Sequence, residues 1–497
     1  MKRSAFNLSN YKLLSCDGGE LIPCGIMEVL PGDSVQQSTN LLLRASPLLS
    51  PVMHPVHVRI HHWYVPHRLV WDEFEDFITG GPDGNNASVY PTITFASGVA
   101  VGTLGDYLGI PTGVNGIEVS ALPFRGYAKI WNEWYRDQDL QTKLVIDETS
   151  GPDTTTSTTL QNVCWEKDYF TSSRPWEQKG PSITIPIGDS APVHGIGLKE
   201  NLNPTANPGP INETQPGGLD GGNYAFGQQS SAGAGLFIKT TAATVDAYPM
   251  ITADLSNASA VTVNLLREAL ALQRYEEARA RYGSRYVEYL RYLGVRSSDA
   301  RLQRPEYLGG GKQTIQFSEV LQTAEGTDPV GAIKGHGIAA MRSNRYRRFF
   351  EEHGYVFSFM SVKPKTMYGN GLPRHWNRRT KEDYWQREFQ HIGQQEVLNK
   401  EVYGAHSAPN GTFGYQDRYD EYRRVESTIG GEFRTTLDFW HMARIFGSDP
   451  ALNADFVKCV PTERNFAVPS EDVYWVMARH SVQARRLVAP VGTSYIF

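Results

Sequence analysis

Five of the thirteen histidines gather in one short stretch, VMHPVHVRIHHWYVPHR (52–68). Imidazole is a frequent metal ligand and general base, so such a cluster would suit a metal site. The alternating apolar residues predict a β-strand, on which His57 and His61 lie about 13 Å apart, too far to share one ion. Arg59, a cation, lies between them. We therefore predict no structural metal here, and histidines that hydrogen-bond locally or contact a partner chain; a ligand set completed from elsewhere is the alternative.

Motifs for enzyme chemistry are incomplete. GGGKQT has Gln313 where a phosphate-binding loop needs Ser or Thr. GHGIAA, from Gly335, fits the dinucleotide pattern, but the preceding DPVGAIK is a poor strand. There is no G-x-S-x-G, and no carboxylate pair stands out. The sequence predicts a protein that is not an enzyme and needs no cofactor.

Composition limits the classes of partner. The formal charge of −5 argues against a surface that is basic throughout, so any contact with a polyanion must be a local patch. The 48 basic residues are mostly Arg, which suits stacked and bidentate contacts at interfaces. The four cysteines form no C-x-x-C pair, and the amino end lacks the apolar run of a secretory signal. Four cysteines are also too few for a disulfide scaffold of this size, so free thiols in a reducing cytoplasm are expected. No window is apolar enough to span a membrane.

Two acid-free basic clusters could contact single-stranded nucleic acid, since cations bind phosphates and aromatic rings stack on bases. RSNRYRR contributes Arg342, Arg345, Arg347 and Arg348. KPKTMYGNGLPRHWNRRTK contributes Lys363, Lys365, Arg374, Trp376, Arg378 and Arg379. An Arg-rich subunit interface explains the second cluster equally well.

Two helical patterns present aromatic stripes. After Pro66 the apolar residues take helical spacing and include Trp71 and Phe74, and YAKIWNEWYRD places Trp131 and Trp134 on one helical face. Core packing is the simpler interpretation of the second stripe. These four aromatic residues are nevertheless candidates for a subunit interface.

The order of patterns predicts four regions. Residues 1–50 form an extended arm, and 51–147 contain strands and helical insertions. Residues 148–260 are rich in Pro, Gly, Asn and Ser, as expected of a surface insertion. Residues 261–497 contain a long helical pattern and further strands. Strands separated by long excursions indicate a β-sandwich elaborated by insertions.

Several segments resemble the major capsid proteins of microviruses, the gokushovirus branch in particular. These are RASPLLSPVMHPVHVRIHHWYVPHRLVWDEFEDFITGG, PFRGYAKIWNEWYRDQDLQT, CWEKDYFTSSRPWEQKG, FNLSNYKLLSCDGGELIPCGIMEVLPGDS and GEFRTTLDFWHMARIF. They are spread over the length of the chain, and together they are specific where any one alone would not be.

The resemblance implies a mainly β fold, an eight-stranded jelly-roll sandwich with long helical and loop insertions. It further implies that sixty copies form a T=1 icosahedral shell around a circular single-stranded DNA genome. The implied partners are small DNA-packaging and pilot or minor capsid proteins and a host cell-surface receptor. The protein would belong to a virion assembled in the cytoplasm of a bacterial host, and region 148–260 resembles the insertion that forms a surface protrusion.

Two other functions share some of these features. A carbohydrate-binding β-sandwich would also have aromatic and Gly-rich loops, but carbohydrate-cleaving relatives would need acidic pairs and usually a secretion signal. A single-stranded-DNA replication protein would need chelating histidine pairs or a nucleotide loop. Sedimentation separates the three, because only the capsid protein forms megadalton shells.

Overall fold

The computed structural model describes residues 3–181, 183, 193–194, 196–197, 209–215, 219–226, 237–238, 252–253, 263–283, 285–323 and 329–491. The chain forms two compact units: Met1–Lys179 with Glu277–Phe497, and Gly180–Glu276. Antiparallel sheets dominate the first unit, so the expected mainly β class is confirmed. Within the described residues, no helix is long and apolar enough to cross a membrane.

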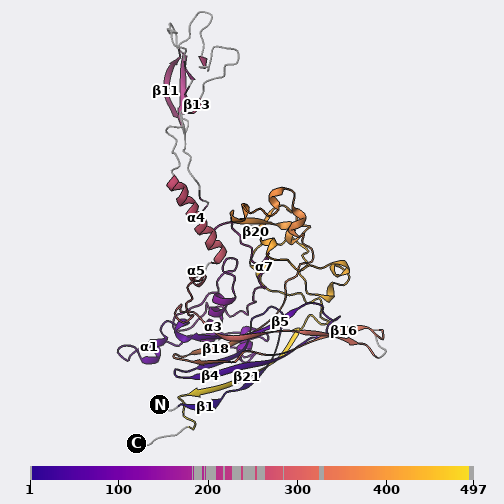
Figure 1. The fold of residues 1–497 in the computed structure, drawn as a ribbon. Helices are drawn as coiled ribbons and strands as arrows, with labels where there is room; N and C mark the ends of the chain where they lie inside the picture. The colour runs from indigo at the N-terminus through magenta and orange to yellow at the C-terminus, as the bar shows by residue number, and fades with distance from the viewer. Residues whose placement is uncertain are drawn as a thin grey trace, which may run out of the picture. The chain divides into compact units, whose positions relative to one another are not determined.

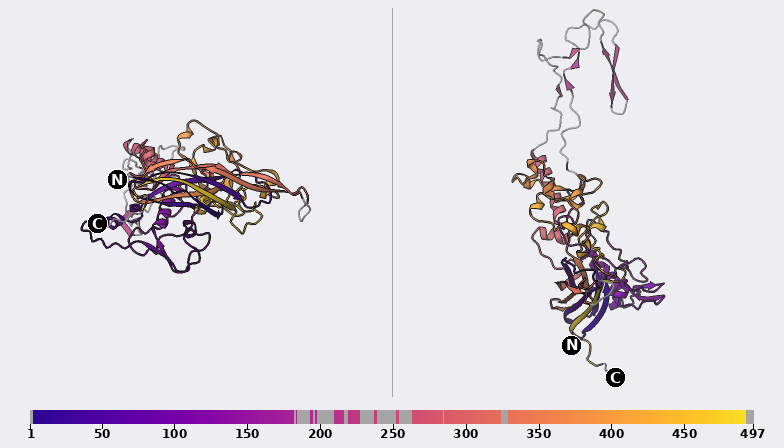
Figure 2. Two further views of the ribbon diagram at one scale, coloured as in Figure 1. Left: turned by 90° about the horizontal axis from the view of Figure 1, so that it is seen from below. Right: turned by 90° about the vertical axis from the view of Figure 1, so that its right-hand side faces the viewer.

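The larger sheet has seven strands, all antiparallel (Figure 1). Its order is β1 (Ser4–Asn7) and β2 (Asn10–Cys16), both on β21 (Tyr474–Arg486), then β4 (Ser34–Ala45), then β16 (Ile333–Arg342) with β17 (Tyr346–Phe349), and finally β15 (Gln316–Leu321). The first strand therefore lies beside the last, at one edge of the sheet (Figure 2). This pairing brings residues near the two ends of the described chain, Ser4 and Arg486, together in one sheet.

The smaller sheet has four strands in the order β14 (Glu306–Thr314), β5 (Val56–Pro66), β18 (Gly354–Pro364) and β3 (Ile22–Val29). The histidine-rich stretch is its central strand β5, so the predicted strand is confirmed. Val56, Val58 and Ile60 are buried, while His57 and Arg59 between them are partly exposed. The alternation of apolar and polar residues in this part of the sequence thus matches the alternation of buried and partly exposed side chains along the strand.

The main core lies between the two sheets. Alternate residues of β4 and β21, including Leu43 and Val476, meet alternate residues of β5 and β18, including Ile60 and Val362. All four side chains are essentially inaccessible to solvent. The two sheets therefore form the β-sandwich suggested by the strand pattern, with one layer of apolar side chains between them.

A second core covers the outer face of the four-stranded sheet. Here α3 (Leu122–Ile130) and the π-helical turn η2 (Trp131–Tyr135) pack Tyr127 and Trp131 against Phe357 of β18. Gly126 permits this approach, because a Cβ at that position would lie 2.9 Å from the Phe357 ring. The amphipathic helix expected from YAKIWNEWYRD is confirmed.

The remaining elements of the first unit are short. One longer helix, α4 (Val263–Tyr282), begins in the second unit and ends in the first, which resumes at Glu277. The helices are η1 (His67–Leu69), α1 (Phe74–Thr79), α2 (Leu104–Leu108), α5 (Tyr286–Tyr292), η4 (Arg374–Asn377), η5 (Lys381–Asp383), η6 (Phe389–His391), α6 (Asn399–Val402), η7 (Asp420–Tyr422), η8 (Gly431–Arg434), η9 (Asp438–Trp440) and α7 (Ala454–Val457). The strands are β6 (Thr92–Phe95), β7 (Ile117–Ser120), β19 (Gln394–Leu398) and β20 (Thr412–Asp417).

The second unit contains paired strands. They are β8 (Val193–His194) with β13 (Thr252–Ala253), β9 (Ile196–Gly197) with β12 (Phe237–Ile238), and β10 (Gly209–Gln215) with β11 (Leu219–Phe226). This unit overlaps the predicted insertion 148–260. Most residues of that insertion from 182 onward lie outside the described residues. The four region boundaries stay a prediction.

Truncating Trp131 is expected to destabilise the subunit. Its side chain is 4% exposed, and Nε1 donates to the carbonyl of Asn162 (3.0 Å). Trp131→Ala should lower the free energy of unfolding by about 3–5 kcal/mol, because it leaves a cavity and an unpaired carbonyl. Urea unfolding measures this, with Trp376→Ala as the control, since Trp376 is 62% exposed. Equal stability of the two variants would contradict the core position of Trp131.

Candidate nucleic-acid interface and subunit contacts

The outer face of the seven-stranded sheet is open to solvent within the described part of the chain. Tyr11 and Leu13 of β2 are 65% and 81% exposed, and Trp475 of β21 is 46% exposed. Arg44 of β4 and Arg342 of β16 are exposed on the same face. The four-stranded sheet is largely covered on both faces along β18 and β5, although its edge strand β14 stays partly exposed, so the seven-stranded sheet offers the more extensive open surface to other molecules.

Strand register sets the residues of this face in rows. One row reads Arg342, Asn40, Arg479 and Tyr11 across β16, β4, β21 and β2. Another row reads Ile338, Arg44, Trp475 and Ser15. An apolar row of Ala340, Leu42, Met477 and Leu13 lies between them. Neighbouring strands are about 4.8 Å apart, so each ring has a guanidinium on the next strand, Arg479 beside Tyr11 and Arg44 beside Trp475.

The cations on this face are largely uncompensated. We call the following set the basic sheet face: Arg44, Arg342, Arg345, Arg347, Arg479 and Arg485, with Tyr11 and Trp475. Among described residues, none of these guanidiniums forms an ion pair, although Arg479 lies 5.5 Å from the ring centroid of Tyr11. Arg345 Nε lies 3.0 Å from the side-chain amide of Gln36. Unpaired guanidiniums beside exposed rings can bind phosphates and stack on bases.

Three of the four arginines predicted from RSNRYRR belong to this face. Arg348 does not, because it pairs with Glu306 of β14 (2.9 Å). Arg44, Arg479 and Arg485 were missed, since each lies in a strand distant in sequence from the predicted cluster. The signal was present in YWVMARHSVQARR, where period-two alternation puts Trp475, Arg479 and Arg485 on one side.

Three of the six residues predicted in the second basic cluster are engaged within the subunit. Arg374 pairs with Glu401 (2.9 Å), and Arg378 lies 3.8 Å from Glu421 and over the ring of Tyr422. Lys363 is buried, donates to the carbonyl of Cys164 (3.0 Å), and has its pKa lowered by burial. Lys363 is therefore enclosed within the subunit and is not available to DNA.

Lys365, Trp376 and Arg379 are the members of this cluster that stay exposed. Among described residues, the guanidinium of Arg379 donates only to the backbone carbonyls of Trp376 and Arg378. These three side chains remain available to a partner.

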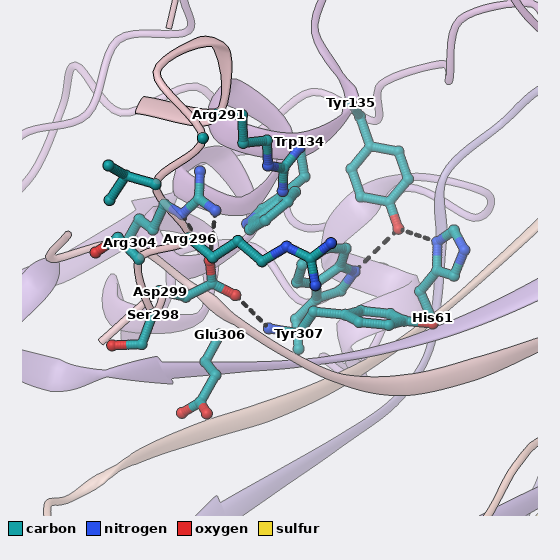
Figure 3. A pocket seen from close by; sticks show the side chains of 14 residues that line it. His61, Trp134, Tyr135, Arg291, Arg296, Ser298, Asp299, Arg304, Glu306 and Tyr307 are labelled. Atoms are coloured by element: carbon teal, nitrogen blue, oxygen red, sulfur yellow. Dashed lines mark hydrogen bonds and ion pairs between the residues drawn. The ribbon is translucent and has the colours of Figure 1, made fainter. Parts of the chain in front are cut away.

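The four candidate interface aromatics occupy different environments. Trp71 and Trp131 lie in the subunit core, where they are not accessible to another copy. Phe74 at the start of α1 is partly buried against Trp71 and His67. Trp134 lines an open cleft of about 1110 Å³ (Figure 3). Only Phe74 and Trp134 are placed where a neighbouring copy could approach.

The histidines of β5 each have a separate local partner. His57 Nδ1 lies 3.1 Å from Thr314, His61 Nδ1 lies 2.7 Å from the Tyr135 hydroxyl, and His62 bonds to Ser358 (2.9 Å). Burial lowers the pKa of His61 to about 4 and that of His62 to about 3, so both are neutral at pH 7. Within the described residues, no group of three or more His, Cys, Asp or Glu side chains could hold a metal.

The amino-acid sequence is similar to those of known proteins over nearly its whole length, and these similarities indicate the function of the chain. The model of the family described as "Capsid protein (F protein)" matches residues 1–495. The chain belongs to this phage capsid protein family. The resemblance to microvirus major capsid proteins is thereby confirmed, and the protein is a structural component of a phage rather than an enzyme.

Three relatives show how much of the chain is shared. Each is a "Capsid protein VP1". That of Bdellovibrio phage phiMH2K is 38% identical, covering 95% of this chain and 90% of the relative. That of Chlamydia phage 1 is 33% identical (95% and 92%), and that of Spiroplasma virus 4 is 31% identical (92% and 87%). The similarity thus includes both sheets and the segments between them, and it implies a virion location.

Proposed function

We propose that sixty copies of this chain assemble into a T=1 icosahedral shell whose basic sheet face contacts a circular single-stranded DNA genome. Membership of the capsid family supports assembly from many copies. The observation that supports the DNA contact is the set of unpaired guanidiniums interleaved with Tyr11 and Trp475 on the open sheet. Among described surfaces, it combines phosphate-binding and base-stacking groups over several strands.

The strand order supports an eight-stranded jelly roll as the scaffold of this shell. The principal strands in chain order are β2, β3, β4, β5, β14, β16, β18 and β21. One sheet has the order β2, β21, β4, β16, and the other β3, β18, β5, β14. Apart from β5 and β14, which are neighbours in one sheet, successive strands alternate between the two sheets, as in the jelly rolls common among capsid proteins.

Photochemical cross-linking tests the DNA contact. Ultraviolet irradiation of filled particles should link the genome to peptides that contain Tyr11 and Trp475, because stacked aromatic rings lie against the bases. Digestion and mass spectrometry identify the linked peptides, with empty particles as the control. Cross-links confined to other segments, such as the one that contains Trp376, would place the DNA on the second cluster instead.

The remaining partners belong to the same proposal. Small DNA-packaging proteins and pilot or minor capsid proteins would join the shell in the cytoplasm of a bacterial host, and the insertion 148–260 would meet a host cell-surface receptor. The composition of the insertion supports an external role, because residues 201–235 contain no Lys or Arg and therefore offer nothing to DNA phosphates.

Shortening the insertion is expected to separate attachment from assembly. Replacing residues 203–233 with a short Gly and Ser linker should leave particles that assemble and package DNA, because loop length costs little closure entropy. Adsorption to host cells should fall at least tenfold, measured as phage left in the supernatant. Unchanged adsorption by intact particles, or failure to assemble, would contradict this role.

A further inference from the structure

The cleft in Figure 3 has an aromatic floor. The ring centroid of Trp63 lies 4.7 Å from that of Trp134 and 4.9 Å from that of Tyr307. The Tyr135 hydroxyl joins His61 and the Trp63 indole nitrogen, which fixes the rings on β5 and η2. The floor is therefore rigid and presents flat apolar surface to an incoming group.

Two free cations border this floor. Of the two described carboxylates that line the cleft, Asp299 neutralises Arg304 and Glu306 pairs with Arg348 (2.9 Å). Arg304 also lies over Trp134, with the guanidinium carbon 4.2 Å from the ring centroid. Arg291 and Arg296 line the same cleft, and within the described part of the chain neither has an ion-pair or hydrogen-bond partner for its side chain. The cleft therefore suits an occupant that is both apolar and acidic.

The position of the cleft argues against the genome as that occupant. His61 and Trp63 lie on the outer side of β5, the side covered by α3 and η2, whereas Val58 and Ile60 face the core between the sheets. The basic sheet face is on the far side of that core. A strand of DNA on the basic sheet face is thus separated from the cleft by the whole sandwich.

An apolar and acidic projection exists on the same chain. Residues 69–124 contain seven carboxylates and no Lys or Arg. Within them α1 exposes Phe77 and Ile78 beside Glu75 and Asp76, and it projects from the edge of the subunit (Figure 1). Among described residues, the carboxylates of Glu75 and Asp76 have no ion-pair partner. Trp71 supports the projection through Phe77, with ring centroids 4.8 Å apart.

We propose that α1 of one copy inserts into the cleft of a neighbouring copy. Glu75 and Asp76 would pair with Arg291 and Arg296, while Phe77 and Ile78 would pack on Tyr307 and Trp134. A six-residue helix is about 9 Å long and about 10 Å wide, which a cleft of about 1110 Å³ can receive. The acidic projection and the cationic cleft are also complementary in charge.

This contact joins two different surfaces, so it is heterologous and closes into a ring when repeated about a rotation axis. It rests on the proposed shell, since it supplies one of the contacts that a closed assembly of identical copies needs. Phe74 and Trp134, the two accessible members of the aromatic set predicted from the sequence, lie in the two halves of the contact.

A charge exchange tests the contact. The variants Glu75→Arg with Asp76→Arg, and Arg291→Glu with Arg296→Glu, should each lower the yield of assembled oligomers by about tenfold or more, because like charges then face each other. Combining all four substitutions restores opposite charges and should return the yield to near that of the wild type. Native mass spectrometry measures oligomers and shells in one sample, and circular dichroism verifies that each subunit is folded. Arg387→Glu and Glu388→Arg, both at exposed positions, are the matched controls.

The outcomes separate the contact from the shell. Double variants that assemble as well as the wild type would overturn the contact alone. Double variants that fail, with no rescue by the combination, would show that the cleft holds some other partner and would also overturn it. A wild-type chain that stays monomeric in the presence of its phage partners would contradict both the shell and the contact.

Discussion

Replacing Arg44, Arg342 and Arg479 with glutamine is expected to give shells that form normally and retain far less DNA. The three guanidiniums lie on β4, β16 and β21 in two rows separated by one apolar row, and they have no ion-pair partner among the described residues. Each phosphate contact to a single strand contributes about 0.7 to the slope of log affinity against log salt, so the slope of DNA retention should fall by about two. The ratio of absorbance at 260 and 280 nm, followed through a salt titration of purified particles, measures this.

The matched control replaces three exposed arginines outside the basic sheet face, Arg267, Arg301 and Arg387, with glutamine. It changes the net charge equally, so a similar loss of DNA in the control would assign the effect to total charge. If the face variant instead prevents subunits from associating without DNA, the basic sheet face is a subunit interface.

A large loss of stability is also expected from Arg125→Met. The Arg125 and Asp153 side chains are both 0% exposed, with Nε 2.8 Å from Oδ2, and Arg125 also donates to the carbonyl of Val70 (3.1 Å). Removing the cation leaves an unpaired carboxylate in the interior, which costs about 3–5 kcal/mol. Shell yield should collapse with the stability of the subunit, as measured by urea unfolding and by sedimentation of the particles.

Two further variants make this prediction specific. Arg125→Met with Asp153→Leu removes both charges and should recover much of the lost stability, because a buried ion pair contributes little over an apolar pair. Arg423→Met removes an exposed partner of Asp420 (3.6 Å) and should cost about 1 kcal/mol or less. A loss below 1 kcal/mol for Arg125→Met alone would mean that water reaches Asp153.

Local pattern was enough to predict particular elements. The alternation in VHVRIHHWYVP gave strand β5 with its buried face, and the aromatic spacing in YAKIWNEWYRD gave the helix that covers it. Both predictions depend on neighbours within a few residues. The same spacing could not separate core from interface, because Trp131 and Trp134 belong to one stripe. Only the folded structure shows that Trp131 is buried in the core while Trp134 lines the open cleft.

Contacts between residues distant in sequence determine which arginines are ion-paired within the subunit and which remain free at its surface. Arg374 and Arg378 lie in an acid-free stretch of sequence, yet Glu401 and Glu421 fold back onto them. Conversely, Arg44 and Arg479 are separated by most of the chain and become neighbours of Arg342 only through the register of β4 with β16 and β21. The charge clusters in the sequence therefore located three of the six arginines of the basic sheet face, and strand pairing adds the other three.

The mass of the particle tests the central proposal most directly. Charge-detection mass spectrometry of particles made from this chain with its phage partners, emptied of DNA, should give a protein shell of sixty 55.5 kDa chains, about 3.3 MDa before minor proteins are added. Filled particles should be heavier by the mass of one single-stranded genome. A population confined to small oligomers, or a shell whose mass corresponds to a copy number other than sixty, would contradict the T=1 assembly.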